Sequence, residues 1–173
     1  MANHNCTTNL GDKKSVRLWK DLYAISDGSW KKAIVTIITN PCFHSVCLFR
    51  LSSLLYRLRL TLLAKLIWYL NRVIYCVDID YRADLAGGLV LVHGLGVVIG
   101  CGVVSKGKLV VYQHVTLGGN RGRKSVINNQ EMQQPYIEED VRIFTGASVF
   151  GPVHIKKGTV IKAGSIITDL NEV

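Results

Sequence analysis

IDYRAD-LAGGLV-LVHGLG-VVIGCG-VVSKGK-LVVYQH-VTLGGN, residues 79–120, divides without a gap into seven units of six residues. The first position of every unit is aliphatic, and the same period resumes at residue 137. Strands alternate with a period of two and helices with a period of 3.6, so neither explains a period of six. The period predicts a prism of short strands, the hexapeptide form of the parallel β-helix, with about four coils from Ile79 to Thr168. The predicted inward residues are Ile79, Leu85, Leu91, Val97, Val103, Leu109, Val115, Ile137, Ile143, Val149, Ile155, Ile161 and Ile167.

One segment interrupts this period. Residues 121–136, RGRKSVINNQEMQQPY, are mostly polar or charged. Long connections in compact folds are usually functional or disordered. We expect this extended loop to leave the prism at a corner, where it could cover a neighbouring surface.

The first part of the chain has helical periodicity instead. Apolar residues recur at helical spacing from Ser15 to about Leu70. Ser29 could cap a second helix, and Pro41 is placed to open a third, since proline is tolerated in a first turn. We therefore predict a helical N-terminal region, 1–77, and a mainly β domain, 78–173, which is a parallel β-helix with the extended loop at 121–136.

The chain is basic, with 21 Lys and Arg against 12 Asp and Glu and a formal net charge of +9. Such a charge suits a phosphorylated cofactor, a nucleic acid or a membrane surface, and also a soluble basic surface without a partner. Arg57, Arg59, Lys65 and Arg72 lie among apolar helical residues, and a solvated helix face is the favoured interpretation. Peripheral membrane contact is less favoured, and we expect no nucleic-acid partner.

Cellular location is inferred from three features. The opening sequence MANHNCTTNLGDKKS lacks the apolar core of a signal peptide. The most apolar stretch, 60–70, contains Lys65 and is too short to span a bilayer. The five cysteines are an odd number without CxxC spacing, which favours reduced thiols over a disulfide framework or a zinc site. We expect a cytoplasmic protein that binds no metal.

His93 and Asp78 are the residues that suggest catalysis. Asp78 lies 15 residues before His93, three short of one coil of three hexapeptides, so both should lie near one corner on adjacent coils. A carboxylate there could fix the imidazole tautomer and stabilise its cation, as a general base requires. Asp80 is a competing carboxylate, and His114 could be an ordinary corner residue. A lone histidine is more often structural, but the nearby carboxylate favours catalysis.

The residues Asp78-Ile79, Val92-His93-Gly94 and Gly96-Val97-Val98-Ile99-Gly100, with Val115-Thr116-Leu117-Gly118-Gly119, carry a specific resemblance. They resemble the serine acetyltransferase family, a branch of the hexapeptide-repeat acyltransferases. The match resumes from Pro135 to Ser165 beyond the loop. This resemblance implies a left-handed β-helix, and the hand rests on it alone, because parallel crossovers are otherwise nearly always right-handed.

The resemblance also implies roles for individual residues. His93 would be the base that removes the acceptor hydroxyl proton for attack on the thioester of acetyl-CoA, with Asp78 as its orienting partner. Gly119, Thr145 and Ala163 match positions that line the CoA groove. The family forms its sites between neighbouring subunits, so a homotrimer is expected.

The departures from the family concern the acceptor. Asp27 matches a family aspartate, although Gly28 replaces the proline that follows it. Val92 stands where the family has an aspartate, and Gln133-Gln134 stand where it has an Arg-His pair that contacts serine. Losing these charges removes much of the complementarity to a free amino acid.

We therefore expect Asp27, Gln133 and Gln134 to bind a neutral hydroxylated acceptor. The predicted function is acetyl-CoA-dependent O-acetylation, with a sugar of a surface polysaccharide or its precursor as acceptor. Serine O-acetylation in cysteine biosynthesis is the alternative. An inactive structural or interaction subunit is a second alternative, which the retained His93 and Asp78 argue against.

Overall fold

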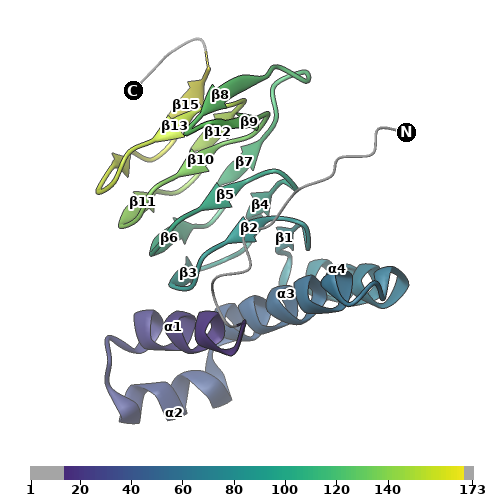
Figure 1. The fold of residues 1–173 in the computed structure, drawn as a ribbon. Coiled ribbons are helices and arrows are strands. Elements are labelled where there is room, and N and C mark those ends of the chain that lie inside the picture. Colours follow the sequence, from purple (N-terminus) through teal and green to yellow (C-terminus); the bar gives the residue numbers. More distant parts are fainter. Residues whose placement is uncertain (1–13, 170–173) are drawn as a thin grey trace.

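A layer of helices lies at one end of a prism of short strands in the computed structural model, which describes residues 14–169 (Figure 1). The predicted boundaries also include residues 1–13 and 170–173, which lie outside the described residues. Four helices are followed by the strands of the prism. The helices are α1 (Lys14–Ser26), α2 (Trp30–Thr39), α3 (Pro41–Arg57) and α4 (Thr61–Tyr75).

Local sequence sets the beginnings of two helices. α3 begins at Pro41, as predicted, and the Asn40 side chain accepts hydrogen bonds from the backbone N–H groups of Cys42 (2.9 Å) and Phe43 (3.2 Å). An Asn cap followed by proline satisfies the free donors of a first turn. α2 begins immediately after Ser29, although the Ser29 hydroxyl makes no capping hydrogen bond.

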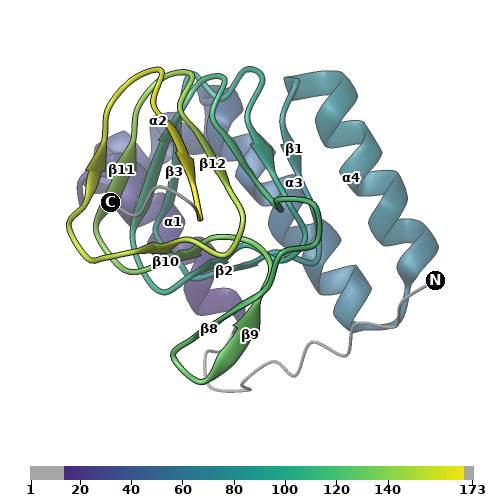
Figure 2. The ribbon, with the colours of Figure 1, turned by 90° about the horizontal axis from the view of Figure 1, so that it is seen from above.

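The prism has three parallel faces, here named A, B and C in the order in which the chain visits them. The chain completes four A–B–C coils and adds one strand, which agrees with the predicted number. Figure 2 shows the coils superposed, with α4 outside their outline. Face A contains β1 (Asp78–Ile79), β4 (Val98–Ile99), β7 (Thr116–Gly118), β12 (Ser148–Phe150) and β15 (Ile166–Thr168); face B contains β2 (Asp84–Leu85), β5 (Val104–Ser105), β10 (Tyr136–Ile137) and β13 (His154–Ile155); face C contains β3 (Leu89–Val92), β6 (Leu109–Tyr112), β11 (Val141–Ile143) and β14 (Val160–Ile161).

All thirteen predicted inward residues are buried, none more than 8% exposed. The unbroken period is nevertheless wrong at one point. Ile79 pairs with Ile99, a coil of 20 residues, whereas Ile99 pairs with Leu117, a coil of 18 residues. The two extra residues lie in the corner 93–96, between Leu91 and Ile99. The pattern hides this insertion because residues two apart in a strand both point inward, so a slip of two still meets an aliphatic residue.

A buried ion pair joins the helical layer to the first coil. Asp21 on α1 is fully buried, and its Oδ2 accepts from Arg50 Nε of α3 at 2.9 Å. Its Oδ1 accepts from Arg50 Nη2 at 3.0 Å and from the backbone N–H groups of Gly88 and Leu89 at 2.8 Å each. Arg50 also donates to the carbonyl oxygens of residues 85–86. Every ligand of this carboxylate is therefore a donor fixed by the fold.

The interruption at 121–136 is not an irregular loop. It contains an antiparallel hairpin of β8 (Ser125–Ile127) and β9 (Gln130–Met132). Asn128 and Asn129 form its turn, with φ of 50° and 60°. Two consecutive residues with positive φ are the signature of a type I′ turn, which asparagine tolerates better than most residues. The hairpin lies outside the outline of the coils (Figure 2).

The base of this hairpin is tied to the last coil. Asp169 accepts hydrogen bonds from Asn120 Nδ2 (2.8 Å) and Arg123 Nη1 (3.0 Å). These bonds, with the Asn120 bond the largest cause, lower the pKa of the Asp169 carboxyl below its ordinary value. Ile127 and Met132 are buried against Tyr136, so an apolar contact supports the same attachment.

Candidate active site

His93 lies in the corner that leads from face C to face A, here named corner CA. This corner comprises residues 93–96, 113–114, 145–146 and 163–164 on successive coils. Backbone hydrogen bonds stack them: His114 N donates to Leu95 O (2.9 Å), Gly146 N to Gln113 O (3.0 Å) and Gly164 N to Thr145 O (2.9 Å). Corner CA therefore carries His93 together with two of the three residues predicted to line the CoA groove, Thr145 and Ala163.

The two-residue insertion makes His93 project from this corner. His93 is exposed and has φ +54°, a left-handed conformation that is uncommon for a residue other than glycine. The next residue is held in place, because Gly94 N donates to Cys42 Sγ on α3 at 3.3 Å. Strained residues persist where the surroundings over-determine them, and they cluster at functional sites. Within residues 14–169 the imidazole has no hydrogen-bond partner, so both ring nitrogens are free to meet a substrate.

Asp78 lies at the same corner, one coil before His93, but the structure does not join the two. Its Oδ1 accepts a hydrogen bond from Trp68 Nε1 at 2.8 Å, and its Oδ2 lies 3.5 Å from Arg72 Nε. Within the described part of the chain, no hydrogen bond links Asp78 to His93. The carboxylate is half-buried and turned towards α4. Its role as partner of His93 stays a prediction.

The competing residues are placed differently. Asp80 is bound by the Arg82 guanidinium through two bonds of 2.9 and 2.7 Å, so its carboxylate is already engaged. The His114 ring packs against Gly96, where an added Cβ would collide with it. His114 thus forms the floor beside the projecting corner that carries His93.

Gln133 and Gln134 lie at the other end of face A, in the corner that leads to face B, here named corner AB. The Gln134 side chain packs against Gly100, and its Nε2 lies 3.6 Å from Cys101 Sγ. Its Oε1 is buried without a hydrogen-bond partner. Gly119 is also in this corner, because a Cβ there would lie 3.5 Å from Gln133 O. The residues predicted to bind acceptor thus lie together with the third predicted CoA residue.

In one chain, corners AB and CA are separate. Strand β4 runs from Gly96 in one corner to Gly100 in the other, and four residues of strand span about 13 Å. His93 therefore does not meet Gln134 within a single copy.

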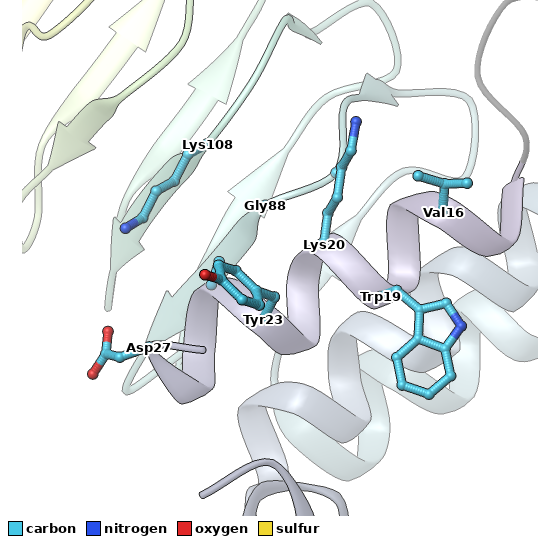
Figure 3. Close-up of a pocket in the computed structure, with 9 residues that line it drawn as sticks. Val16, Trp19, Lys20, Tyr23, Asp27, Gly88 and Lys108 are labelled. Carbon is cyan, nitrogen blue, oxygen red and sulfur yellow. The ribbon is translucent and has the colours of Figure 1, made fainter. Parts of the chain in front are cut away.

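Asp27 is in a third place. It ends α1 at the rim of a shallow, mostly apolar groove of about 500 Å³, which Figure 3 shows beside Lys108 and Tyr23. Its carboxylate is exposed and lies 3.3 Å from Lys32 Nζ. The structure thus distributes the predicted site residues over two corners and one groove.

The sequence did not identify Trp68 and Arg72 as neighbours of Asp78. Both lie on α4, four residues apart, so they share one face of the helix. The Arg72 guanidinium also stacks over the Trp68 ring, 5.1 Å from its centroid. The spacing was visible in the sequence, but only the packing of α4 beside β1 brings this face to the carboxylate.

No protein-family model matches the chain. It is similar to the serine acetyltransferase of Bacillus subtilis, with 32% identity over 131 residues that cover 76% of this chain and 58% of that protein. The serine acetyltransferase of Bacillus pumilus is 31% identical over 141 residues, 82% of this chain and 62% of that protein. The chain thus spans little more than half of the length of these relatives.

Solved structures are similar as well. The serine acetyltransferase of Neisseria gonorrhoeae in complex with serine matches 90% of this chain and 64% of its own, with a TM-score of 0.76 and 28% identity. The serine acetyltransferase of Brucella abortus in complex with coenzyme A matches 89% and 62%, with a TM-score of 0.76 and 25% identity. These likenesses and the parallel faces confirm the predicted left-handed parallel β-helix with a helical N-terminal region.

Proposed function

Because the chain is a serine acetyltransferase-like protein of the hexapeptide-repeat acyltransferase class, we propose that it transfers acetyl from acetyl-CoA to the hydroxyl of L-serine. The observation that carries the proposal is corner CA, where His93 projects with both ring nitrogens free. Relatives and structural neighbours that are serine acetyltransferases support the acceptor. The sequence favoured a sugar acceptor, but none of these comparisons supports that interpretation, and the serine alternative fits them better.

His93 acts as the general base in this proposal. One ring nitrogen accepts the proton of the acceptor hydroxyl while the hydroxyl oxygen attacks the thioester carbonyl carbon. The carbon–sulfur bond then breaks, and the departing thiolate takes the proton from the imidazolium. The products are an O-acetyl ester and the free thiol of CoA, so atoms and charges balance. Asp78, one coil away, stabilises the transient imidazolium by its charge.

The surface of corner CA suits an extended substrate such as acetyl-CoA. A Cβ added at Gly146 or Gly164 would meet no atom within 4 Å, so the corner is open beyond the coil of His93. Thr145 is half-buried and Ala163 is exposed, so neither presents a bulky side chain. Lys162, which is exposed beside them, supplies positive charge for phosphates.

A complete site needs a second copy of the chain. His93 and Gln134 lie in different corners of one prism, so a site that contains both forms only where corner CA of one copy meets corner AB of another. A three-sided prism that repeats this contact closes as a ring of three. We therefore include a homotrimer in the proposal.

The missing charges predict weak binding of serine. Val92, Gln133 and Gln134 cannot replace the charged partners of the family pattern. Each charged hydrogen bond is worth about 1.5–3 kcal/mol, so losing two weakens binding by roughly two to four powers of ten. We expect saturation by serine only above about 1 mM, the upper end of ordinary KM values.

Release of free thiol from acetyl-CoA tests the proposal. The purified protein is assayed with L-serine, with D-serine, with neutral saccharides and without acceptor. The proposal predicts release that depends on L-serine and a product that is O-acetylserine by mass. Release with saccharides and not with serine would restore the sugar acceptor, which the neutral Gln133 and Gln134 favour. No release above the rate without acceptor would favour an inactive subunit.

A further inference from the structure

α4 presents a broad apolar face that nothing in the described chain covers. Leu62, Leu66, Tyr69 and Val73 follow one another at helical spacing and are 81%, 51%, 58% and 59% exposed. Such spacing forms one stripe along a helix. Leu63, Leu70 and Ile74 widen it and are also exposed. The opposite side of α4, which includes Ala64 and Asn71, is buried in the protein.

α2 presents a second face of the same kind. Trp30, Ile34, Ile37 and Ile38 recur at helical spacing and are all about half exposed or more. α2 is also the helix furthest from the prism (Figure 1). Contiguous apolar surface of this kind marks an interaction site.

Cations flank these faces, and acids are nearly missing. Residues 14–77 contain ten Lys and Arg and two Asp and Glu, a difference of +8. Residues 78–169 contain ten and eight, a difference of +2. Of the two acids in the helical layer, Asp21 is buried against Arg50 and only Asp27 is exposed. Nearly all of the net charge therefore belongs to the layer that carries the apolar faces.

The predicted basic patch is more selective than its sequence suggests. Arg57 turns to the prism, 3.5 Å from Asp84, and Arg72 lies beside Asp78. Arg59 and Lys65 are exposed and have no acidic partner among the described residues. Lys65 lies on the flank of the apolar stripe of α4, and Arg59 lies just before this helix. The solvated polar face that the sequence favoured is instead an apolar face with a cationic border.

We propose that α4, together with α2, attaches the protein to the surface of an anionic phospholipid bilayer. Apolar faces bordered by Lys and Arg are typical of helices that lie in the membrane interface. Within residues 14–169 no single helix is long and apolar enough to cross a membrane; only α2 and α3 pass that test as a pair, and they are bent by 79°. Attachment parallel to the surface fits this length.

Charge decides between a bilayer and a second copy of the chain. Two helical layers that meet would bring +8 against +8, and like charges across an interface oppose binding. An anionic bilayer attracts the same charge, with a contribution from each Lys or Arg near the surface. Corner CA rests on the first turn of α3 through Gly94 and Cys42, so attachment would hold His93 close to the membrane surface.

Vesicle co-sedimentation of the full chain tests the proposal. Vesicles of phosphatidylcholine with phosphatidylglycerol are compared with vesicles of phosphatidylcholine alone. The charge variant is Arg59→Glu with Lys65→Glu, and the apolar variant is Leu62→Gln with Val73→Gln. The matched control is Arg142→Glu with Lys156→Glu, which makes the same charge change on exposed residues of the prism.

We expect the wild type and the control to sediment with anionic vesicles and not with neutral ones. Each variant of α4 should lower the partition coefficient by about tenfold or more. The wild-type binding should weaken as salt rises, since screening shortens the reach of the charges. Absence of binding to anionic vesicles, or equal loss in the control, would overturn the proposal. Light scattering that shows dissociation of the apolar variant, without vesicle binding by the wild type, would assign the face to a second copy instead.

Discussion

Asp21→Asn tests how the helical layer is held to the prism. The substitution keeps the shape of the side chain and replaces one carboxylate oxygen by an NH2 group. Oδ1 accepts from Gly88 N, Leu89 N and Arg50 Nη2, while Oδ2 accepts from Arg50 Nε. In either orientation of the amide a donor therefore faces a donor. Removing one partner of a buried ion pair costs about 3–5 kcal/mol, because the other charge stays buried.

The expected loss is a large part of the stability of a typical domain, about 5–15 kcal/mol. With a slope of about 2 kcal/mol per molar urea, a loss of 4 kcal/mol moves the unfolding midpoint by about 2 M. Asp27→Asn, on the same helix, is the matched control, because its carboxylate is exposed and lies 3.3 Å from the exposed Lys32. This control should change stability by less than about 0.5 kcal/mol. Equal midpoints for the two variants would refute the assigned role of Asp21.

Two further predictions concern the corners and the hairpin. Gly96→Ala places a Cβ against the His114 ring at φ +68° and should lower the free energy of unfolding by more than Gly158→Ala, where φ is +74° but no atom lies within 4 Å. Equal losses in thermal unfolding would show that only backbone strain acts. Asp169→Asn should raise hydrogen exchange in the hairpin, because the bond to Arg123 loses its charge. Since the pKa of Asp169 is lowered in the fold, wild-type protection should be complete above the ordinary aspartate pKa of about 3.9 and lost as pH falls through the lower folded pKa. Protection in Asp169→Asn that matches the wild type at pH 6 would contradict this anchoring.

The prism was predictable from the sequence because burial in a β-helix repeats at a fixed interval. All thirteen inward residues were identified in this way. The insertion at 93–96 was not, because Val97 and Ile99 both point inward and either fits the pattern. Comparing pairs such as Val97 and Ile99 with the single Ile79 cannot decide the register without the ladder itself.

The hairpin and the surroundings of Asp78 were missed for different reasons. Asn128-Asn129 between Val126-Ile127 and Glu131-Met132 is a signal for a two-residue turn, so the hairpin could have been recognised. The contacts of Asp78 could not, because they depend on where α4 packs. The sequence identified His93 and Asp78 by their spacing, and the structure places them at one corner without joining them.

Turnover of His93→Ala tests the central claim most directly. With acetyl-CoA and L-serine both saturating, we predict that kcat falls by about 10²–10⁴-fold while CoA binding is unchanged. His114→Ala, on the next coil of the same corner, is the control and should keep most of its turnover. A His93→Ala protein with a kcat close to that of the wild type would contradict the account.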